Sequence, residues 1–210
     1  MKNGGRGDRV RDLEIRELTP ALWPDLEKLF GPNGACAGCW CMWWRIPEGE
    51  RFRQIHGAEG RRRQKALVLA GRSQGLLAFA EGAPVGWCAY GPRPDFVALQ
   101  RSRTLACDDS DRVWSVPCFF VKTGWRGRGV ARSLLRAAVR VLRERGAAIV
   151  EAYPVRPPAT NSSAFTGTVP LFLSEGFEVV AARPRGRQRV RRRLRPDRRG
   201  RDRAGNPGTS

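Results

Sequence analysis

Histidine, tyrosine and lysine are scarce in this sequence, and long hydrophobic runs are missing. Its 210 residues include one His and two Tyr, and only four of its 39 basic residues are lysines. No stretch stays apolar for the roughly eighteen residues that a membrane span requires. The first fourteen residues contain no apolar segment that could act as a secretory signal. We therefore expect a cytoplasmic protein that makes no use of a membrane.

The remaining composition is that of a globular protein. Hydrophobic residues make up 41% of the chain, which is enough for one domain with its own core. We expect that domain at residues 12–195, after a flexible N-terminus (1–11) and before a disordered basic tail (196–210). Six cysteines in a chain without a leader are expected to be reduced thiols rather than disulfides.

Positive charge dominates the sequence. The formal net charge is +19, and proteins that bind nucleic acids carry such a surplus because they contact phosphates. Residues 183–203 alone contain twelve arginines against two aspartates. Because arginine outnumbers lysine so strongly, the surplus also fits a genome-wide bias, and the C-terminal run is typical of a solvated extension. Nucleic-acid binding is therefore the weaker interpretation.

The spacing of apolar residues predicts alternating strands and helices. Pro20 after a Thr predicts one helix start, and Gly31 predicts its end. A turn at 81–84 predicts a hairpin. We expect strands at 13–18, 76–80, 85–90, 112–121, 147–153, 177–182 and 188–194, and helices at 20–30, 59–71, 127–145 and 169–175.

Residues 112–153 are expected to form a β-α-β unit whose two strands are parallel and buried. Pro117 lies inside the first of these strands. Because proline has no N–H to donate to a ladder, it predicts a bulge or an interruption at that point.

The stretch FVKTGWRGRGVARSLL (120–135) places three glycines and three arginines where this strand passes into the helix. Main-chain N–H groups at a helix N-terminus attract phosphates, and glycine lets a ligand approach the backbone closely. Arg126 and Arg128 add charge that can neutralise a diphosphate. A P-loop would need Lys-Ser or Lys-Thr after the glycines, and a dinucleotide fingerprint would need glycine at Arg132; neither is present.

Arg126-x-x-Gly129-x-Ala131 matches the R/Q-x-x-G-x-G/A signature of the GCN5-related N-acetyltransferases. With the CFFV strand (118–121), the following helix, the GAPVGW hairpin and the EGF step (175–177), the chain resembles this family over about residues 13–194. The resemblance implies an α/β (α+β) fold with a mixed, mostly antiparallel sheet, a splayed parallel pair and flanking helices. It also implies acetyl transfer from acetyl-CoA to an amine.

Matched residue by residue, the resemblance implies that acetyl-CoA binds to residues near the middle of the sequence. The strand residues Phe119, Phe120 and Val121 would pair with the pantetheine arm. The thioester would enter the cleft where strand 147–153 diverges from strand 112–121. The diphosphate would lie on the corner, at Arg126, Gly127, Arg128, Gly129, Val130, Ala131 and Arg132.

The sequence departs from the family at its usual catalytic positions. In the family, a tyrosine four residues before the glycine of the EGF step often acts as the general acid. This sequence has Phe172 at that position. Phe165 stands where an asparagine is usual, and Asn161 lies four residues earlier. The usual acid is therefore absent or is supplied by another residue.

Two residues of the strand 147–153 are our candidates for catalysis. An alkylammonium must lose a proton before it attacks, and Glu151 is the candidate base. Tyr153 is the candidate acid. A salt bridge for Glu151, packing for Tyr153 and a water relay are the alternatives. Asp108, Asp109 and Asp111 could attract a cationic substrate, although a solvated loop explains them as well.

Residues 34–46 are rich in cysteine and tryptophan. Three cysteines with the single histidine could bind zinc, but no second Cys-x-x-Cys or His pair completes the usual spacing, so we expect no metal. Packing is the simpler role for these cysteines, and for Cys118 no histidine is placed to activate a nucleophile. We expect the tryptophans to shape an acceptor pocket, with burial as the alternative. The residues concerned are Cys36, Cys39, Cys41 and His56, and Trp40, Trp43 and Trp44.

Three functional hypotheses follow. The first is an acetyl-CoA-dependent N-acetyltransferase whose acceptor is a small amine, amino-acid-like or aminoglycoside-like. The second is a non-catalytic sensor of acyl-CoA with the same fold, which the missing tyrosine favours. The third is a basic nucleic-acid-binding protein. A homodimer stays open.

Overall fold

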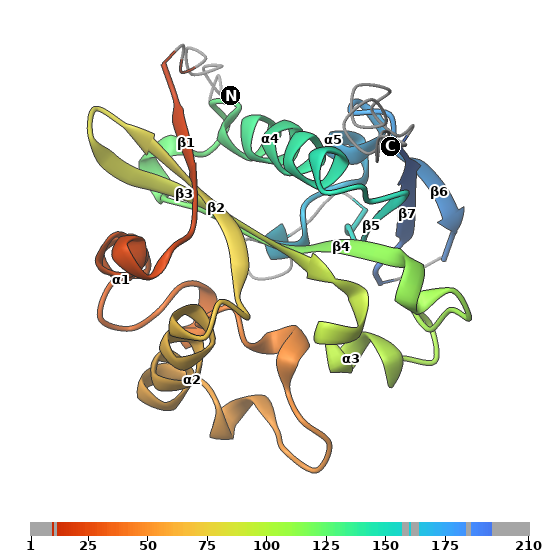
Figure 1. Ribbon diagram of the computed structural model, residues 1–210, viewed down its shortest axis with the longest axis horizontal. Coiled ribbons are helices and arrows are strands. Elements are labelled where there is room, and N and C mark those ends of the chain that lie inside the picture. The colour runs from red at the N-terminus through yellow and green to blue at the C-terminus, as the bar shows by residue number, and fades with distance from the viewer. Residues whose placement is uncertain (1–9, 11, 157–159, 161–163, 184–185, 195–210) are drawn as a thin grey trace, which may run out of the picture.

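The computed structural model describes residues 10, 12–156, 160, 164–183 and 186–194. Most of the predicted flexible N-terminus and all of the predicted tail (196–210) lie outside these residues. The described strands form one sheet in the order β1-β2-β3-β4-β5-β7-β6 (Figure 1). Their bounds are Glu14–Glu17 (β1), Gln74–Ala80 (β2), Ala83–Pro92 (β3), Val113–Val121 (β4), Ile149–Ala152 (β5), Glu178–Ala181 (β6) and Arg189–Arg193 (β7).

The sheet is mixed, as predicted. β4 and β5 run parallel, and the other neighbouring strands in the described part of the chain pair antiparallel. The helices are Trp23–Phe30 (α1), Gly57–Leu69 (α2), Val97–Gln100 (α3), Val130–Glu144 (α4) and Val169–Leu173 (α5). In Figure 1, α1, α2 and α3 lie on one side of the sheet, and α4 and α5 lie on the other. Among the helices of the described residues, none has the length and apolarity to cross a membrane.

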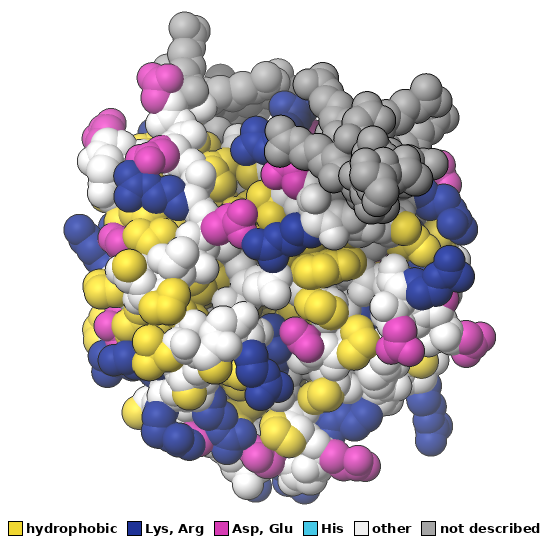
Figure 2. All heavy atoms as spheres, in the orientation of Figure 1, with side chains coloured by type: hydrophobic (Ala, Val, Ile, Leu, Met, Phe, Trp, Pro, Cys, Tyr) yellow, Lys and Arg dark blue, Asp and Glu magenta, His cyan; other side chains and the backbone are white. Residues whose placement is uncertain are grey.

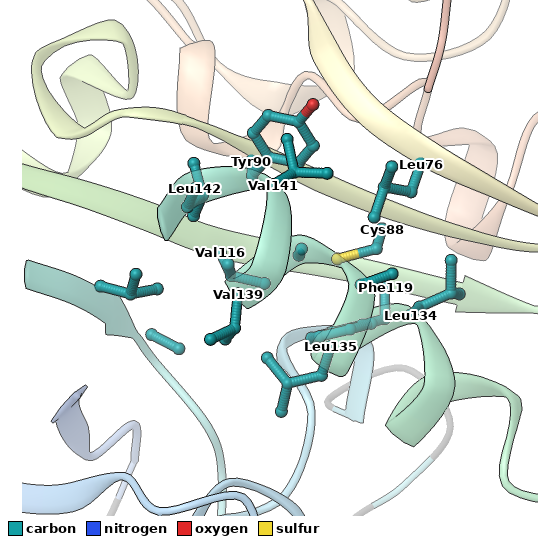
Figure 3. Packing of buried hydrophobic residues seen from close by; sticks show 14 of the residues in the cluster. Leu76, Cys88, Tyr90, Val116, Phe119, Leu134, Leu135, Val139, Val141 and Leu142 are labelled. Carbon is teal, nitrogen blue, oxygen red and sulfur yellow. The ribbon is translucent and has the colours of Figure 1, made fainter. Parts of the chain in front are cut away.

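The core on the α4 side forms because one face of that helix is apolar. Leu134, Leu135 and Val139 point toward the sheet, where Cys88 and Phe119 meet them (Figure 3). The core on the opposite face is rich in aromatic rings from α1, from the segment 40–42 and from Trp87. Side chains of β4 alternate between these two cores, so the strand is covered on both faces.

Helix α4 begins at Val130, three residues later than the sequence suggested. Gly127 has a φ of 75° and Gly129 a φ of 90°, values that a right-handed helix does not contain. The two glycines therefore form a turn before the helix rather than its first residues. This turn is the corner that the sequence predicts as a phosphate site.

Pro117 lies at a bulge, which confirms the predicted irregularity. Ala89 pairs with Cys118 and Gly91 pairs with Ser115, so two residues of β4 lie opposite one residue of β3. The parallel ladder between β4 and β5 ends at the pair Val116 and Ala152. From this point to Val121, no described strand pairs with the β5-side edge of β4.

Candidate active site

The unpaired edge of β4 borders a cleft, and Trp44 lies between β4 and the end of β5 at this point. Its indole Nε1 donates a hydrogen bond of 3.0 Å to the carbonyl oxygen of Pro117. Its ring lies 5.6 Å, centroid to centroid, from the ring of Tyr153, just beyond the end of β5. A large side chain therefore fills the space where the next ladder bonds would form, and the two parallel strands separate there.

At the corner, six consecutive main-chain N–H groups are free. The amides of Trp125 and Arg126 donate to carbonyl oxygens within the preceding turn. The amides of residues 127–132 donate to no acceptor among the described residues. A Cβ added at Gly127 or Gly129 would meet nothing within 4 Å, so a ligand can reach this backbone. Free amides at the start of a fifteen-residue helix form an anion site.

Three arginines surround this corner, and each has a different setting. The Nε of Arg126 donates to the carbonyl oxygen of Val121 over 3.0 Å. The Arg128 guanidinium lies 5.4 Å from the centroid of the Trp125 ring. Arg132 forms an ion pair with Glu175, in which its Nε lies 3.4 Å from the carboxylate. Positive charge therefore gathers where the amides are free.

A cavity of about 1040 Å³ joins the corner, the β4 edge and the cysteine-rich segment. The predicted residues that line it are Phe119, Phe120, Val121, Arg126, Gly127, Gly129, Val130, Ala131, Arg132 and Trp43. Arg128 does not line it. The cavity is therefore long enough to extend from an anion site to a pocket of aromatic side chains.

A sequence profile of the acetyltransferase (GNAT) family matches residues 38–166, more than half of the chain. The chain belongs to this family. The co-substrate of the family is acetyl-CoA. No curated protein matches the sequence.

Solved structures show the same GNAT fold. The ribosomal-protein-alanine N-acetyltransferase from Brucella melitensis aligns at 21% identity with a TM-score of 0.54, over 86% of this chain and 99% of that one. The GNAT domain of S. lividans PAT aligns at 19% identity with a TM-score of 0.54, over 87% and 90%. An acetyltransferase from Thermus thermophilus aligns at 18% identity with a TM-score of 0.52, over 89% and 99%.

The three predicted tryptophans of this GNAT protein have three different settings. Trp43 is 38% exposed and lines the cavity beside Phe52 and Phe165. Trp40 is 1% exposed and packs against Trp23 and Phe30, so it belongs to the core. Trp44, at 6%, holds the cleft open without lining the main cavity.

Glu151 and Tyr153 lie behind the cavity wall, and neither lines it. Both are fully buried. The Glu151 carboxylate accepts hydrogen bonds from the Nε of Arg93 (3.0 Å), from the Nε of Arg191 and from the Tyr153 hydroxyl (2.8 Å). Burial, and then the Glu151 charge, raise the pKa of the Tyr153 phenol well above its usual range. Their positions therefore provide no direct contact with a substrate in the cavity.

The other departures from the family also have structural settings. Phe172 is fully buried between Phe119 and Phe177, whereas Phe165 lines the cavity. Asn161 lies outside the described residues. Asp108, Asp109 and Asp111 do not line the cavity, and both oxygens of Asp109 bind the Arg191 guanidinium at 2.7 Å. That ion pair holds the pKa of the Asp109 carboxyl well below its usual range.

Four cysteine thiols line the cavity, although the sequence predicted that these cysteines only pack in the core. They are Cys36, Cys39, Cys41 and Cys118. The Trp87 Nε1 lies 3.3 Å from the Cys41 sulfur and donates to it, and the Cys118 thiol also donates to Cys41. These hydrogen bonds lower the pKa of Cys41. The hydrogen bond that Cys118 donates to Cys41 raises the pKa of Cys118. In the described part of the chain, no group of three or more His, Cys, Asp or Glu residues could hold a metal ion.

Sequence reasoning missed one cationic residue of this cavity. Arg187 lines the wall near Phe165 and lies over the Trp44 ring, 5.3 Å from its centroid. In the sequence it is one of the twelve arginines of residues 183–203, and nothing in that run distinguishes it. Only the return of the chain after β6 toward β5 brings it to the cavity.

Proposed function

We propose that this GNAT protein transfers the acetyl group of acetyl-CoA to a primary amine of a small molecule. The observation that carries the proposal is the row of six free amides at residues 127–132 beside an unpaired strand edge. The amides, with Arg126 and Arg132, bind the diphosphate. The pantetheine arm follows the β5-side edge of β4 past Val121 and Phe120. The thioester then lies near Cys118, where β4 and β5 have separated.

The chemistry needs an amine without its proton and a polarised thioester carbonyl. Among the described residues that line the cavity, none is Asp, Glu, His or Tyr. We therefore propose that the amine loses its proton to water in the cavity, which is the relay that the sequence left open, and that the CoA thiolate takes up a proton from water as the C–S bond breaks. A main-chain N–H on the free edge of β4 is placed to stabilise the oxyanion.

In this proposal Glu151 and Tyr153 are positioning residues rather than the base and the acid. The Tyr153 hydroxyl lies 2.7 Å from the Ser115 hydroxyl on β4, and it donates to Glu151 on β5. Arg93 connects the same carboxylate to the loop that precedes β4, through Ser110 Oγ at 3.0 Å. This network fixes the two strands at the point from which they diverge.

A small acceptor is supported by the aromatic lining of the pocket. Trp43, Phe52 and Phe165 form an aromatic wall, with edge-to-face contacts of 5.2 and 6.3 Å from Trp43 to the two phenyl rings. Aromatic walls bind apolar or flat groups of small molecules.

The binding half of the proposal is tested by thermal unfolding with and without acetyl-CoA. At about a hundred times Kd, the ligand should stabilise the protein by about 2.7 kcal/mol, a rise in Tm of roughly 5–10 °C. Gly129→Val should abolish the shift, because a branched side chain at the corner blocks the amides. Gly49→Val is the matched control, since Gly49 has a φ of 80° in open space and does not line the cavity. A shift that survives in Gly129→Val would contradict the assignment of the corner.

The catalytic half is tested by release of the CoA thiol across a panel of small amines. Turnover with any amine supports the enzyme. Acetyl-CoA binding without turnover across the panel would favour the acyl-CoA sensor, the alternative that Phe172 at the usual tyrosine position supports.

A further inference from the structure

Arg187 lies where two cavities meet. It lines the main cavity, and it also lines a second one of about 470 Å³ together with Trp44, Arg101 and Leu105. Its guanidinium lies over two rings, 5.3 Å from the centroid of Trp44 and 4.9 Å from that of Phe165. The planar group is therefore held by stacking on aromatic rings.

The charge of Arg187 has no counter-ion among the described residues. Its Nε is buried and has no hydrogen-bond partner in this part of the molecule. Its neighbours in sequence differ, because Arg189 and Arg191 both contact the Glu151 carboxylate. Burial lowers the pKa of Arg187. A half-buried cation without a counter-ion is a favourable partner for an anionic ligand.

The backbone that carries Arg187 is fixed. The buried Gln188 side chain donates to the carbonyl oxygens of Arg183 (3.0 Å) and Gly186 (3.3 Å), and accepts from the Arg183 amide (2.7 Å). The main-chain N–H of Gln188 donates to the carbonyl oxygen of Pro154. Arg187 itself forms a β-bridge with Val155, just beyond β5. Arg187 is therefore set in place before a ligand arrives, as a binding residue should be.

The charges of the main cavity point to the same kind of ligand. Its charged described residues are Arg126, Arg132 and Arg187, and none is acidic. The first two belong to the diphosphate corner after Val121. Arg187 lines the part of the wall that Phe165 forms, with its guanidinium 4.9 Å from the centroid of that ring. Glu50, the acidic residue of the second cavity, already has an ion pair with Arg63.

We propose that Arg187 binds an anionic oxygen group, a carboxylate or a phosphate, on the acceptor amine. The acceptors are then amino-acid-like or amino-phosphate molecules, and polycationic aminoglycosides are excluded. This assignment rests on the proposed acetyl transfer for its reaction, but the recognition of the anion does not depend on turnover. The aromatic wall beside Arg187 favours acceptors that also carry a flat or apolar group.

The test is a calorimetric titration of the CoA-saturated protein with three probes that share a phenyl group: phenylacetate, phenyl phosphate and the uncharged phenylacetamide. Saturation with CoA occupies the diphosphate corner, so an anionic probe reports on the other end. We expect phenylacetate, phenyl phosphate or both to bind at least about tenfold more tightly than phenylacetamide. The anion that binds more tightly identifies the acceptor group as carboxylate or phosphate.

Variants assign the effect to one residue. Arg187→Gln should weaken the anionic probe at least about tenfold and leave CoA affinity unchanged, whereas Arg187→Lys should retain part of the binding. Arg140→Gln, which removes one charge from the exposed side of α4, should change neither. If Arg187→Gln does not fold, Arg187→Lys and the wild-type comparison still decide.

Equal affinity of the wild type for all three probes would overturn the proposal, and so would anion binding that is unaffected in Arg187→Gln. If CoA itself does not bind, the proposed function fails, and titration of phenylacetate and phenylacetamide without CoA still tests Arg187.

Discussion

Single residues in this protein have roles that depend on what they touch rather than on their chemistry alone. Cys39 illustrates this, because its thiol lies in the cavity wall yet is largely desolvated. Burial, followed by the neighbouring Cys41, raises the pKa of Cys39 to about 11. A thiol reacts with alkylating reagents only as the thiolate, so Cys39 should be unreactive near neutral pH.

Cys39 should therefore resist iodoacetamide in the folded protein. At pH 8 its thiolate fraction is about one in a thousand, and the rate should keep rising as the pH is raised toward 11. Peptide mass spectrometry after timed labelling measures this, with the urea-unfolded chain as control. Labelling of folded Cys39 at pH 8 as fast as in the unfolded chain would contradict the assigned environment.

Glu151 is a second case, since two arginines and a tyrosine all bind its carboxylate. Glu151→Gln keeps the shape but removes the charge that compensates the fully buried Arg93. We expect a loss of about 3–5 kcal/mol in the free energy of unfolding, measured in urea. Glu14→Gln breaks an exposed pair with Arg16 and should leave the free energy of unfolding nearly unchanged, because solvent screens that pair.

This experiment also distinguishes the two roles of Glu151. A positioning residue predicts lost stability with a similar kcat for the molecules that remain folded. Full stability combined with a large loss of kcat would instead restore Glu151 as the base.

At the scale of elements, the closest approach that sets the site is between α4 and β3. A Cβ on Gly86 would lie 2.7 Å from the Val130 Cγ1 and 3.1 Å from the Leu134 Cδ1. Because Gly86 has no side chain, the first turn of α4 rests directly on the sheet. The same turn carries the free amides of the corner, so this contact fixes their distance from the edge of β4.

Gly86→Ala should move that turn away from the sheet. We expect a loss of about 1–3 kcal/mol in stability from overpacking, together with weaker CoA binding by titration calorimetry. Gly124→Ala is the control, because a Cβ there meets nothing within 4 Å and the φ is ordinary. Unchanged CoA affinity in Gly86→Ala would mean that the position of the turn does not limit binding.

At the scale of the whole molecule, the described basic side chains do not gather into one patch on the face shown in Figure 2. There the described lysines and arginines are spread around the molecule, with acidic and hydrophobic side chains between them. Several arginines are used internally, as Arg93 and Arg191 are in the network of Glu151. The described face in Figure 2 therefore shows no continuous basic surface of the kind that binds nucleic acid.

Deleting residues 196–210 tests the predicted tail, which lies outside the described residues. We expect Tm, acetyl-CoA affinity and turnover to stay within error of the full chain, because the described sheet ends with β7 at Arg193. A large loss of turnover in the truncated protein, with Tm unchanged, would give the tail a part in substrate binding.

Much of this protein could be predicted from local sequence. Alternation, turn residues and apolar spacing placed the elements, and the family signature placed the corner, because these signals act over a few neighbouring residues. The free amides at 127–132 follow from two glycines whose φ is positive. The bulge at Pro117 follows from a missing N–H. Each of these features is determined by backbone chemistry within one stretch of chain.

The tertiary structure alone decided which side chains face the cavity. Trp40, Trp43 and Trp44 lie in one short stretch and are chemically alike, yet one is core, one is wall and one holds the cleft open. Glu151 is a buried structural residue because Arg93 and Arg191 bind its carboxylate. Arg187 lines the cavity, where it lies over the ring of Trp44. Each of these partners is about 40 or more positions away in the sequence. Burial and pairing depend on contacts between segments distant in sequence, so no local pattern could distinguish these outcomes.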